Sequence, residues 1–323
     1  MNLIVQKFGG SSVRDAQRLR NVAAIIADAR QRGNSLIVVL SAQGDTTDEL
    51  LKKARELSDC PSERELDALL ATGEQVSVAL CAILLEELGI PAVSLGAWQV
   101  GIRTEDTHGD ARITYIDRKR ILRELENDKV VLVAGFQGID SAGDLTTLGR
   151  GGSDTSAVAL AAYFCAERCE IYTDVDGVYT ADPRIIPTAV KHGEIDCDEM
   201  LALARCGAQV LHDRSVELAK RFGVELEVLS SMERISGTRI VSGTAMSSPH
   251  LAGVTRDHGT ISVVGTGLSS LTDAAARLFQ VLGDAGIAVY EVGQSDTCVH
   301  AKVNEEEALS ALRLAHRLFF EEN

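Results

Sequence analysis

The feature that most constrains the fold is the alternation of short, β-branched apolar segments with longer helical patterns over roughly the first 240 residues. We predict strands, bounded by Gly, Asp or Ser, at 3–8, 35–41, 92–95, 129–136, 170–174 and 224–230. Helical patterns lie between them, for example at 16–30, 75–88 and 187–206. This order predicts a mainly parallel sheet covered by helices on both faces, with ligands at the carboxyl ends of the strands.

A glycine-rich turn lies between an apolar segment and a helical pattern at residues 147–156. It contains Arg150, the pair Gly151 and Gly152, and then Asp154 and Thr155. A turn of this kind feeding a helix presents free backbone N–H groups and the positive end of the helix dipole, which suit a carboxylate or phosphate. The arginine adds a planar fork for the same anion. The alternative is that Asp154 and Thr155 only cap the helix.

A second glycine turn follows the first predicted strand, which runs through Lys7 into Gly9 and Gly10. Small residues there let the backbone approach a phosphate, and the lysine supplies a point charge. The pattern is neither the dinucleotide fingerprint with three spaced glycines nor the nucleotide loop that ends in Gly-Lys-Ser/Thr. The alternative is a tight strand-to-helix turn with one exposed lysine.

A series of motifs follows in a fixed order over roughly the first 240 residues: KFGGSSV (7–13), SAQGDTTD (41–48), TGEQ (72–75), HGDAR (108–112), GFQG (135–138), LGRGGSD (148–154), YTDVDGVY (172–179) and DPR (182–184). The series carries a resemblance to the aspartokinases of the amino acid kinase superfamily. It implies a three-layer αβα amino acid kinase fold with a mainly parallel sheet. The implied reaction transfers the γ-phosphoryl group of ATP, with Mg²⁺, to the β-carboxylate of L-aspartate. The product, 4-phospho-L-aspartate, leads toward lysine, threonine and methionine.

The resemblance also implies a role for each matching residue. An ionised carboxylate is already an adequate nucleophile, so positioning and charge neutralisation would carry the catalysis. No protein metal ligand is assigned, and His108 is given a loop role. Glu74 would meet the substrate ammonium, although it could equally be a first-turn helix residue. The implied sets are Lys7, Arg150 and Asp154 for catalysis; Ser41, Thr47, Glu74, Arg150 and Ser153 for aspartate; and Lys7, Gly9, Gly10, Ser11, Thr173, Asp174, Tyr179, Asp182, Arg184 and Gln209 for the nucleotide.

Gln209 departs from the family pattern, which usually carries a lysine there for the ATP phosphates. An amide can donate a hydrogen bond but offers no net charge to a polyanion. We therefore expect weaker ATP binding than in the relatives, or recruitment of another cation such as Arg214.

A small, polar segment at 242–249 reads as a linker between a catalytic domain at 1–243 and a second domain at 250–323. The second domain is predicted as strands at 251–256 and 260–266, a helix at 273–285, strands at 287–292 and 297–303 and a helix at 305–320. This order resembles one α+β ACT domain where the family normally carries two. The resemblance implies a lysine or threonine effector and a homodimer or higher homo-oligomer. The alternative is an oligomerising appendage without a ligand.

Composition narrows the function classes. The net charge is −15, with 47 acidic and 32 basic residues, which argues against a nucleic acid partner. No apolar run reaches the roughly 20 residues of a membrane span, and the amino-terminal residues do not resemble a secretory signal. The seven cysteines are scattered, which predicts reduced thiols and a cytoplasmic protein. Two alternatives stay open: a kinase for another amino acid carboxylate, and a catalytically weak regulatory subunit that binds amino acids.

Overall fold

The computed structural model describes residues 2–243, 250–269 and 273–322, and the chain divides into two compact units. The first unit comprises the chain up to Asp176 together with Arg221–Ser236, and the second comprises Gly177–Lys220 together with the chain from Gly237. Each unit has its own apolar core. The predicted domain boundary falls on residues 244–249, which are outside the described residues, so it stays a prediction.

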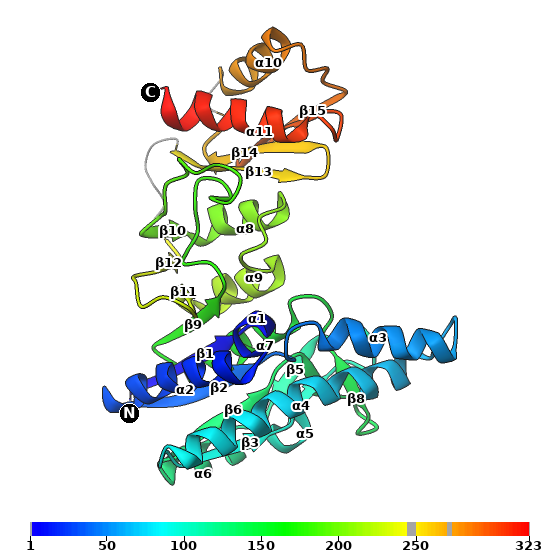
Figure 1. Ribbon diagram of the computed structural model, residues 1–323, viewed down its shortest axis with the longest axis vertical. Helices are drawn as coiled ribbons and strands as arrows, with labels where there is room; N and C mark the ends of the chain where they lie inside the picture. The colour runs from blue at the N-terminus through cyan, green and yellow to red at the C-terminus, as the bar shows by residue number, and fades with distance from the viewer. Residues whose placement is uncertain (1, 244–249, 270–272, 323) are drawn as a thin grey trace. The chain divides into compact units, whose positions relative to one another are not determined.

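Parallel strands form the centre of the first unit in the order β3-β6-β2-β1-β9-β11 (Figure 1). Parallel neighbours need long crossover connections, and helices supply most of them here, which confirms the predicted fold class. The strands are β1 (Asn2–Phe8), β2 (Asn34–Leu40), β3 (Ala92–Leu95), β6 (Val130–Ala134), β9 (Arg168–Thr173) and β11 (Leu226–Ser230).

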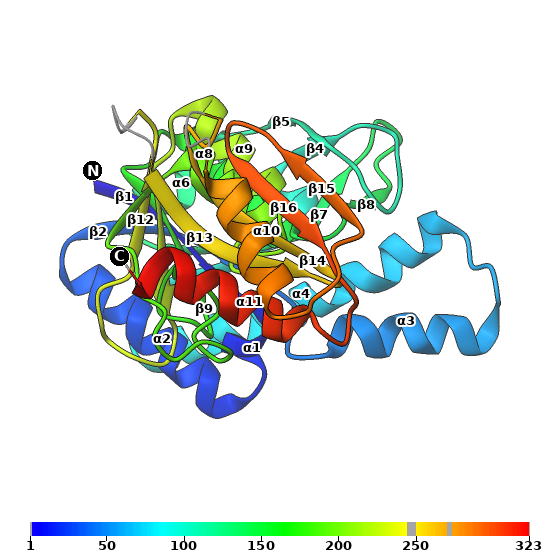
Figure 2. The same ribbon diagram turned by 90° about the horizontal axis from the view of Figure 1, so that it is seen from above.

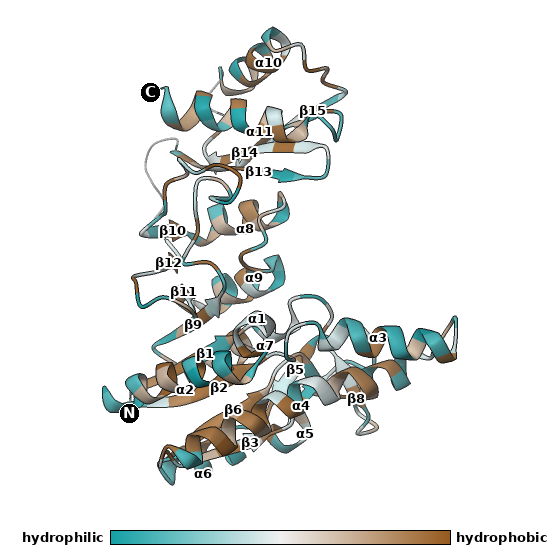
Figure 3. Ribbon diagram, in the orientation of Figure 1, coloured by the Kyte–Doolittle hydropathy of each residue, from teal (hydrophilic) through white to brown (hydrophobic). Residues whose placement is uncertain are grey.

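Helices cover both faces of this sheet because its central strands are apolar on both sides; β2 and β6 are buried along their whole length. On one face, α2 and α4 share a core with Phe8 and Leu132. On the other face, α7 lies against Val39. Figure 3 shows apolar residues gathered along α4 and the neighbouring strands. The helices of this unit are α1 (Gly10–Val13), α2 (Ala16–Gln31), α3 (Thr46–Leu57), α4 (Glu63–Glu87), α5 (Ala97–Val100), α6 (Lys119–Glu126) and α7 (Gly152–Phe164).

The long helix α4 lies beside α3 (Figures 1 and 2) and begins at Glu63, well before the predicted start at residue 75. By length and composition it could cross a membrane, but in the fold it contacts β3, β6 and β8 and carries buried Asp67 and Glu74. Its first half therefore places two carboxylates, Asp67 and Glu74, inside the unit.

A smaller mixed sheet in the first unit has the order β5-β4-β7-β8. These strands have only three or four residues each, too few for a periodic sequence pattern, and the sequence did not predict the sheet. They are β4 (Ile102–Thr104), β5 (Ile113–Ile116), β7 (Gln137–Ile139) and β8 (Leu145–Thr147).

The second unit is built on an antiparallel sheet in the order β13-β14-β16-β15. Helices α10 and α11 share an apolar core with this sheet (Figure 2), and α8 contacts β13 and β14. A short parallel pair, β10 with β12, precedes it. The elements are β10 (Glu194–Asp196), α8 (Cys197–Arg205), α9 (Asp213–Phe222), β12 (Thr238–Val241), β13 (His250–Asp257), β14 (Thr260–Thr266), α10 (Ala274–Asp284), β15 (Glu291–Gln294), β16 (Cys298–Lys302), α11 (Ala308–His316) and the π-helical turn Arg317–Glu321.

The predicted element order of the second domain is confirmed, but two element boundaries within the second unit of the structure were wrong. The helical pattern predicted over 187–206 contains β10 before α8 begins. The strand predicted at 287–292 lies later, as β15, because the end of α10 uses those residues. Gly286 adopts a left-handed φ of 73°, and the Ile287 amide donates to the Leu282 carbonyl, so Ile287 is part of the helix cap.

Candidate active site

The loops that follow β1, β2 and β6 lie along one edge of the parallel sheet. The Ser41 amide donates to the Phe8 carbonyl at 3.1 Å, and the Gly135 amide donates to the Leu40 carbonyl at 3.1 Å. Each loop thus continues the hydrogen bonding of the strands beyond their ends. Because parallel strands present all their carboxyl ends at one edge, the motifs that follow them come together there.

The glycine pair after β1 lets two loops approach each other closely. A Cβ atom on Gly10 would lie 2.8 Å from the Ala42 carbonyl oxygen, and the Gly44 amide donates to the Gly10 carbonyl at 3.0 Å. Ser11, which follows, is exposed. Gly10 is therefore needed for contact between the loops after β1 and β2.

We expect Gly10→Ala to separate these loops, since a Cβ contact under 3.0 Å with backbone forces a shift, and to raise about tenfold the KM for the ATP that the sequence resemblance implies. Steady-state kinetics and thermal unfolding of the variant measure both effects. Gly283→Ala is the matched control, because a Cβ there meets no atom within 4 Å. A Gly10→Ala enzyme with the native KM and thermal midpoint would contradict the proposed role of Gly10 in bringing the two loops together.

Lys7 and Asp154 form an ion pair in which Nζ lies 2.6 Å from Oδ1, with side chains only 11% and 12% exposed. Lys7 lies on the β1 face opposite the core shared by Phe8 and α2, and Asp154 lies in the first turn of α7. The helix instead begins after Gly151, whose φ is 72°, and Asp154 makes no capping hydrogen bond. The sequence alternative in which Asp154 caps the helix is therefore wrong.

Glu74 is a buried carboxylate with one paired and one unpaired oxygen. Its Oε1 accepts a hydrogen bond from the Ala42 amide at 3.0 Å, whereas Oε2 is buried without a hydrogen-bond partner. Burial raises the pKa of this carboxyl to about 7, against the opposing effect of the Ala42 amide. An added cation would stabilise its ionised form and satisfy Oε2.

Glu74 lies in the middle of α4, so the alternative of a first-turn residue is wrong. Gly73 explains how the helix reaches the loop after β2: a Cβ atom on it would lie 2.8 Å from the Ala42 Cβ. A glycine inside a helix costs about 1 kcal/mol relative to alanine. Here it allows the close approach that the Glu74 hydrogen bond requires.

The other residues predicted for aspartate occupy the same unit. Ser41 and Thr47 are half-buried, in the loop after β2 and in the first turn of α3. Ser153 is buried on α7, and a Cβ on Gly135 would lie 2.8 Å from its Oγ. Arg150 is exposed between β8 and α7 and makes no ion pair with the described residues. Its guanidinium is thus accessible to a ligand.

The predicted nucleotide residues Thr173 and Asp174 follow β9, and the Thr173 hydroxyl donates to Asp174 Oδ1 at 3.0 Å. Two serines that the sequence did not single out connect this strand end to the first glycine turn. Ser12 donates its hydroxyl to Ser231 Oγ at 2.8 Å, and Ser231 donates to the Thr173 carbonyl at 3.1 Å. These contacts hold α1 beside the end of β9.

Four predicted nucleotide residues belong to the second unit. Asp182 and Arg184 face each other, with Nε to Oδ1 at 2.9 Å and Nη2 to Oδ2 at 2.8 Å, so the arginine fork is held by a carboxylate. Tyr179 is half-buried and forms a β-bridge with Lys191. Gln209 is exposed in the segment between α8 and α9.

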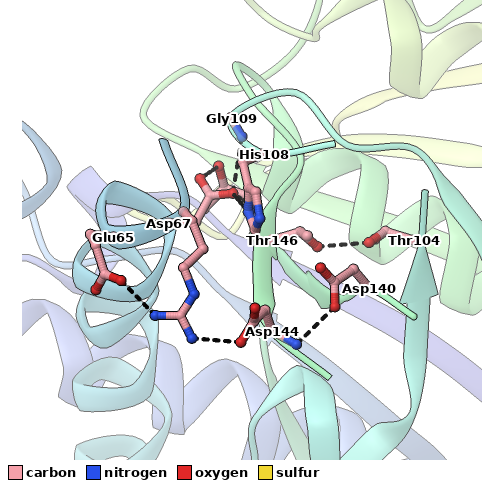
Figure 4. Close-up of polar contacts among 10 residues, drawn as sticks. Glu65, Asp67, Thr104, His108, Gly109, Asp140, Asp144 and Thr146 are labelled. Carbon is pink, nitrogen blue, oxygen red and sulfur yellow. Dashed lines mark hydrogen bonds and ion pairs between the residues drawn. The ribbon is translucent and has the colours of Figure 1, made fainter. Parts of the chain in front are cut away.

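Asp67 of α4 connects the loop at 108–109 to the end of β8 through hydrogen bonds (Figure 4). Its carboxylate is 1% exposed and accepts hydrogen bonds from the His108 ring, the Gly109 amide, and both the amide and the hydroxyl of Thr147. Every oxygen is satisfied, so the residue joins α4 to β8 and to the loop at 108–109. His108 thus has a structural partner, in line with a loop role. Nothing in the sequence distinguished Asp67 from a surface carboxylate.

The parallel sheet, the glycine-containing loops at the carboxyl ends of its strands and the charged side chains of Lys7, Asp154 and Glu74 are features of a phosphotransferase. Comparisons with known proteins identify the family. The amino acid kinase family profile matches residues 2–230, and an ACT domain profile matches residues 261–319. The aspartokinase of Geobacillus stearothermophilus is 50% identical over 299 residues, which are 92% of this chain and 73% of that protein. The chain therefore belongs to the amino acid kinase family and, within it, to the aspartokinases, which are ATP-dependent kinases.

Solved structures agree with this assignment. The aspartate kinase from Synechocystis is 33% identical with a TM-score of 0.70, and the match covers 98% of this chain and 69% of that one. Escherichia coli aspartokinase III, in complex with lysine and aspartate, is 27% identical with a TM-score of 0.71, over 97% of this chain and 83% of that one. The similarity thus extends through both units.

Proposed function

We propose that this protein transfers the γ-phosphoryl group of ATP to the β-carboxylate of L-aspartate. The observation that carries the proposal is Glu74, whose Oε2 is buried without a partner and whose pKa is raised to about 7 by burial. A buried carboxylate with one unpaired oxygen is stabilised by a ligand that brings an ammonium group to that oxygen. The aspartate bound to the related E. coli enzyme supports the same substrate class.

In the proposed pocket, Glu74 pairs with the substrate ammonium, and Arg150 binds a substrate carboxylate through its planar fork. Ser41, Thr47 and Ser153 supply hydroxyl groups around the same ligand. N-acetylated substrates lack the ammonium and would leave the Glu74 charge without compensation. The pocket therefore discriminates between a free amino acid and its N-acyl derivative.

In the proposed nucleotide site, Lys7 neutralises charge on the phosphoryl group, while the backbone amides of Gly10 and Ser11 donate to phosphate oxygens. The Gly9 amide already donates to the Tyr172 carbonyl at 3.2 Å, so Gly9 would shape the turn rather than bind the phosphate. The ion pair with Asp154 holds the ammonium of Lys7 in place before the substrates arrive. The remaining nucleotide contacts are assigned to Thr173, Asp174, Tyr179, Asp182, Arg184 and Gln209.

Mg²⁺ would be held mainly by ATP. Among the described residues, no group of three or more His, Cys, Asp or Glu side chains is placed to hold a metal ion. This ion commonly keeps several waters and binds through substrate phosphates with one or two carboxylates. When bound, it supplies further neutralisation of phosphate charge.

An ADP-release assay with aspartate, glutamate and N-acetylglutamate tests the reaction and its acceptor together. We expect turnover with aspartate alone. Preferential turnover of another acceptor would establish the alternative of a different carboxylate kinase. Absence of turnover, together with binding of lysine or threonine, would establish the alternative of a regulatory subunit.

The same assay with added lysine or threonine tests the ACT domain. We propose that one of these amino acids binds there and inhibits, a proposal supported by the lysine bound to the related E. coli aspartokinase III. We also propose a cytoplasmic homodimer or higher homo-oligomer. Light scattering with and without the effector measures the assembly.

We expect Gln209→Lys to lower the KM for ATP about tenfold. Gln209 is exposed and carries no charge, and a charge-assisted contact to phosphate is worth about 1 to 3 kcal/mol. Steady-state kinetics with varied ATP measure the change. Gln31→Lys, on α2, adds the same charge elsewhere and is the control. Equal KM values for the Gln209→Lys variant and the native enzyme would refute the prediction.

A further inference from the structure

Two cysteines of the second unit lie next to each other although 92 residues separate them in the chain. Cys206 caps the carboxyl end of α8 and Cys298 begins β16, and their sulfurs are 3.4 Å apart. Both thiols are half-buried and neither is in a disulfide. A disulfide has an S–S length of about 2.05 Å, so the sulfurs would need to approach by a little over 1 Å.

Contacts of the main chain hold Cys206 at this position. The Thr255 hydroxyl donates to the Cys206 carbonyl at 2.6 Å. The next residue, Gly207, has a φ of 104°, and a Cβ atom on it would lie 2.8 Å from the Arg256 carbonyl oxygen. The end of α8 is thus fixed on β13 by two neighbouring residues, independently of the thiols.

The alternation of side chains along β16 places Cys298 on the face of the sheet that α8 covers. Val299 and Ala301 of β16 belong to the core shared with α10 and α11. Because successive side chains of a strand point to opposite faces, Cys298 points to the face that α8 covers. Its partner in the register is Val264 of β14, a strand that α8 contacts.

The acidity of the two thiols favours thiol–disulfide exchange that begins at Cys206. A hydrogen bond between the sulfurs lowers the pKa of Cys206 to about 7 and raises the pKa of Cys298, so Cys206 is the better nucleophile near neutral pH. Cys81 and Cys169 of the first unit differ from this pair, because both are buried and burial raises the pKa of each thiol.

We propose that Cys206 and Cys298 form a reversible modification site, which a low-molecular-weight disulfide converts into an intramolecular disulfide. The Cys206 thiolate attacks one sulfur of the reagent, forms a mixed disulfide and releases the first thiolate. The Cys298 thiolate then attacks the Cys206 sulfur, closes the protein disulfide and releases the second. Two protein thiols are oxidised, one small disulfide is reduced to two thiols, and two protons pass to the leaving groups.

The disulfide fixes the end of α8 to β16, three residues before Gln209. Any effect of the disulfide on nucleotide binding rests on the proposed function, which assigns Gln209 to the nucleotide. The site itself does not, since thiol exchange needs no kinase activity. Reversible disulfides of this kind occur in reducing compartments as redox sensors.

The test treats the full-length protein with oxidised glutathione, alkylates the remaining thiols and maps the peptides by mass spectrometry. We expect one cross-linked pair, Cys206 with Cys298, and its loss after dithiothreitol. Closing so long a loop should also raise the thermal midpoint by roughly 5 °C. Alkylation of both residues, glutathione adducts without closure, or a cross-link to another cysteine would overturn the proposal.

Two single variants distinguish the reactivity of the Cys206–Cys298 pair from that of the other thiols. Cys298→Ser should retain a glutathione adduct on Cys206 but lose the cross-link and the rise in thermal midpoint. Cys60→Ser, which removes an exposed thiol of the first unit, is the control and should behave as the native protein. A cross-link that disappears in the control as well would count against the assignment. Because neither readout uses ATP or aspartate, failure of the kinase proposal would leave this result interpretable.

Discussion

An enzyme with alanine in place of Lys7 is expected to phosphorylate aspartate about 10³-fold more slowly at saturating substrate. The Lys7 side chain is only 11% exposed and its ammonium lies 2.6 Å from Asp154, so it is positioned before substrate binds. Its removal takes one positive charge from the transferring phosphoryl group. It also leaves the Asp154 carboxylate unpaired beside a polyanion, which adds repulsion.

A double variant separates these two effects. Lys7→Ala with Asp154→Asn removes the repelling charge as well, so we expect it to turn over about tenfold faster than Lys7→Ala alone. Lys119→Ala, on the exposed side of α6, is the matched control and should retain native kinetics. The measurement is kcat from initial rates of ADP release. A Lys7→Ala enzyme within threefold of the native kcat would remove the basis of the proposed mechanism.

Glu74→Gln is expected to raise the KM for aspartate about 100-fold with a smaller change in the KM for ATP. The amide keeps the size of the side chain and can still accept from the Ala42 amide, but it cannot neutralise an ammonium. Loss of one partner in a buried charge pair costs about 2 to 5 kcal/mol, a range that includes the roughly 2.7 kcal/mol of a 100-fold change. Initial rates with varied aspartate measure it.

The pH dependence of aspartate binding gives an independent check. Burial raises the pKa of Glu74 to about 7, so the free enzyme holds a proton on this carboxyl below that pH. The substrate ammonium binds the ionised form. The KM for aspartate should therefore rise as the pH falls from 8 to 6 in the native enzyme and stay nearly constant in Glu74→Gln.

Stability should respond to the same ionisation with a defined sign. The pKa of Glu74 in the folded protein, about 7, is above its ordinary value of 4.5, so the folded protein binds the extra proton between these values. Its free energy of unfolding falls as the pH rises through this window, by on the order of 3 kcal/mol. Glu74→Gln should thus be more stable than the native protein at pH 8 in urea unfolding. Glu126→Gln, on the surface of α6, is the control; equal stability of all three proteins at pH 8 would argue against a desolvated Glu74.

The parallel sheet could be predicted because each strand carries its own local signal. The apolar segments at β1, β2 and β6 are β-branched, and a Gly or Ser follows each of them. The short strands of the second sheet in the first unit carry no such signal. Their pairing depends on neighbours distant in the chain, such as Arg103 with Ile139.

The long helix α4 shows why the position of Glu74 could not be predicted. Gly73 reads as a helix breaker in the sequence, yet it lies inside the helix, where it allows contact with Ala42. Packing outweighs the intrinsic preference of one residue. The same contact supplies the Glu74 hydrogen bond.

The sequence by itself determined the strand and helix order, the two glycine turns, the motifs that resemble aspartokinases, and the residue types available for binding two anions. Only the tertiary structure decided that Lys7 pairs with Asp154, that Glu74 is desolvated with one free oxygen, and that Cys206 meets Cys298. The physical reason is that pairing, burial and protonation depend on which groups exclude water from a side chain. Those groups lie far away in the chain and come together only when it folds.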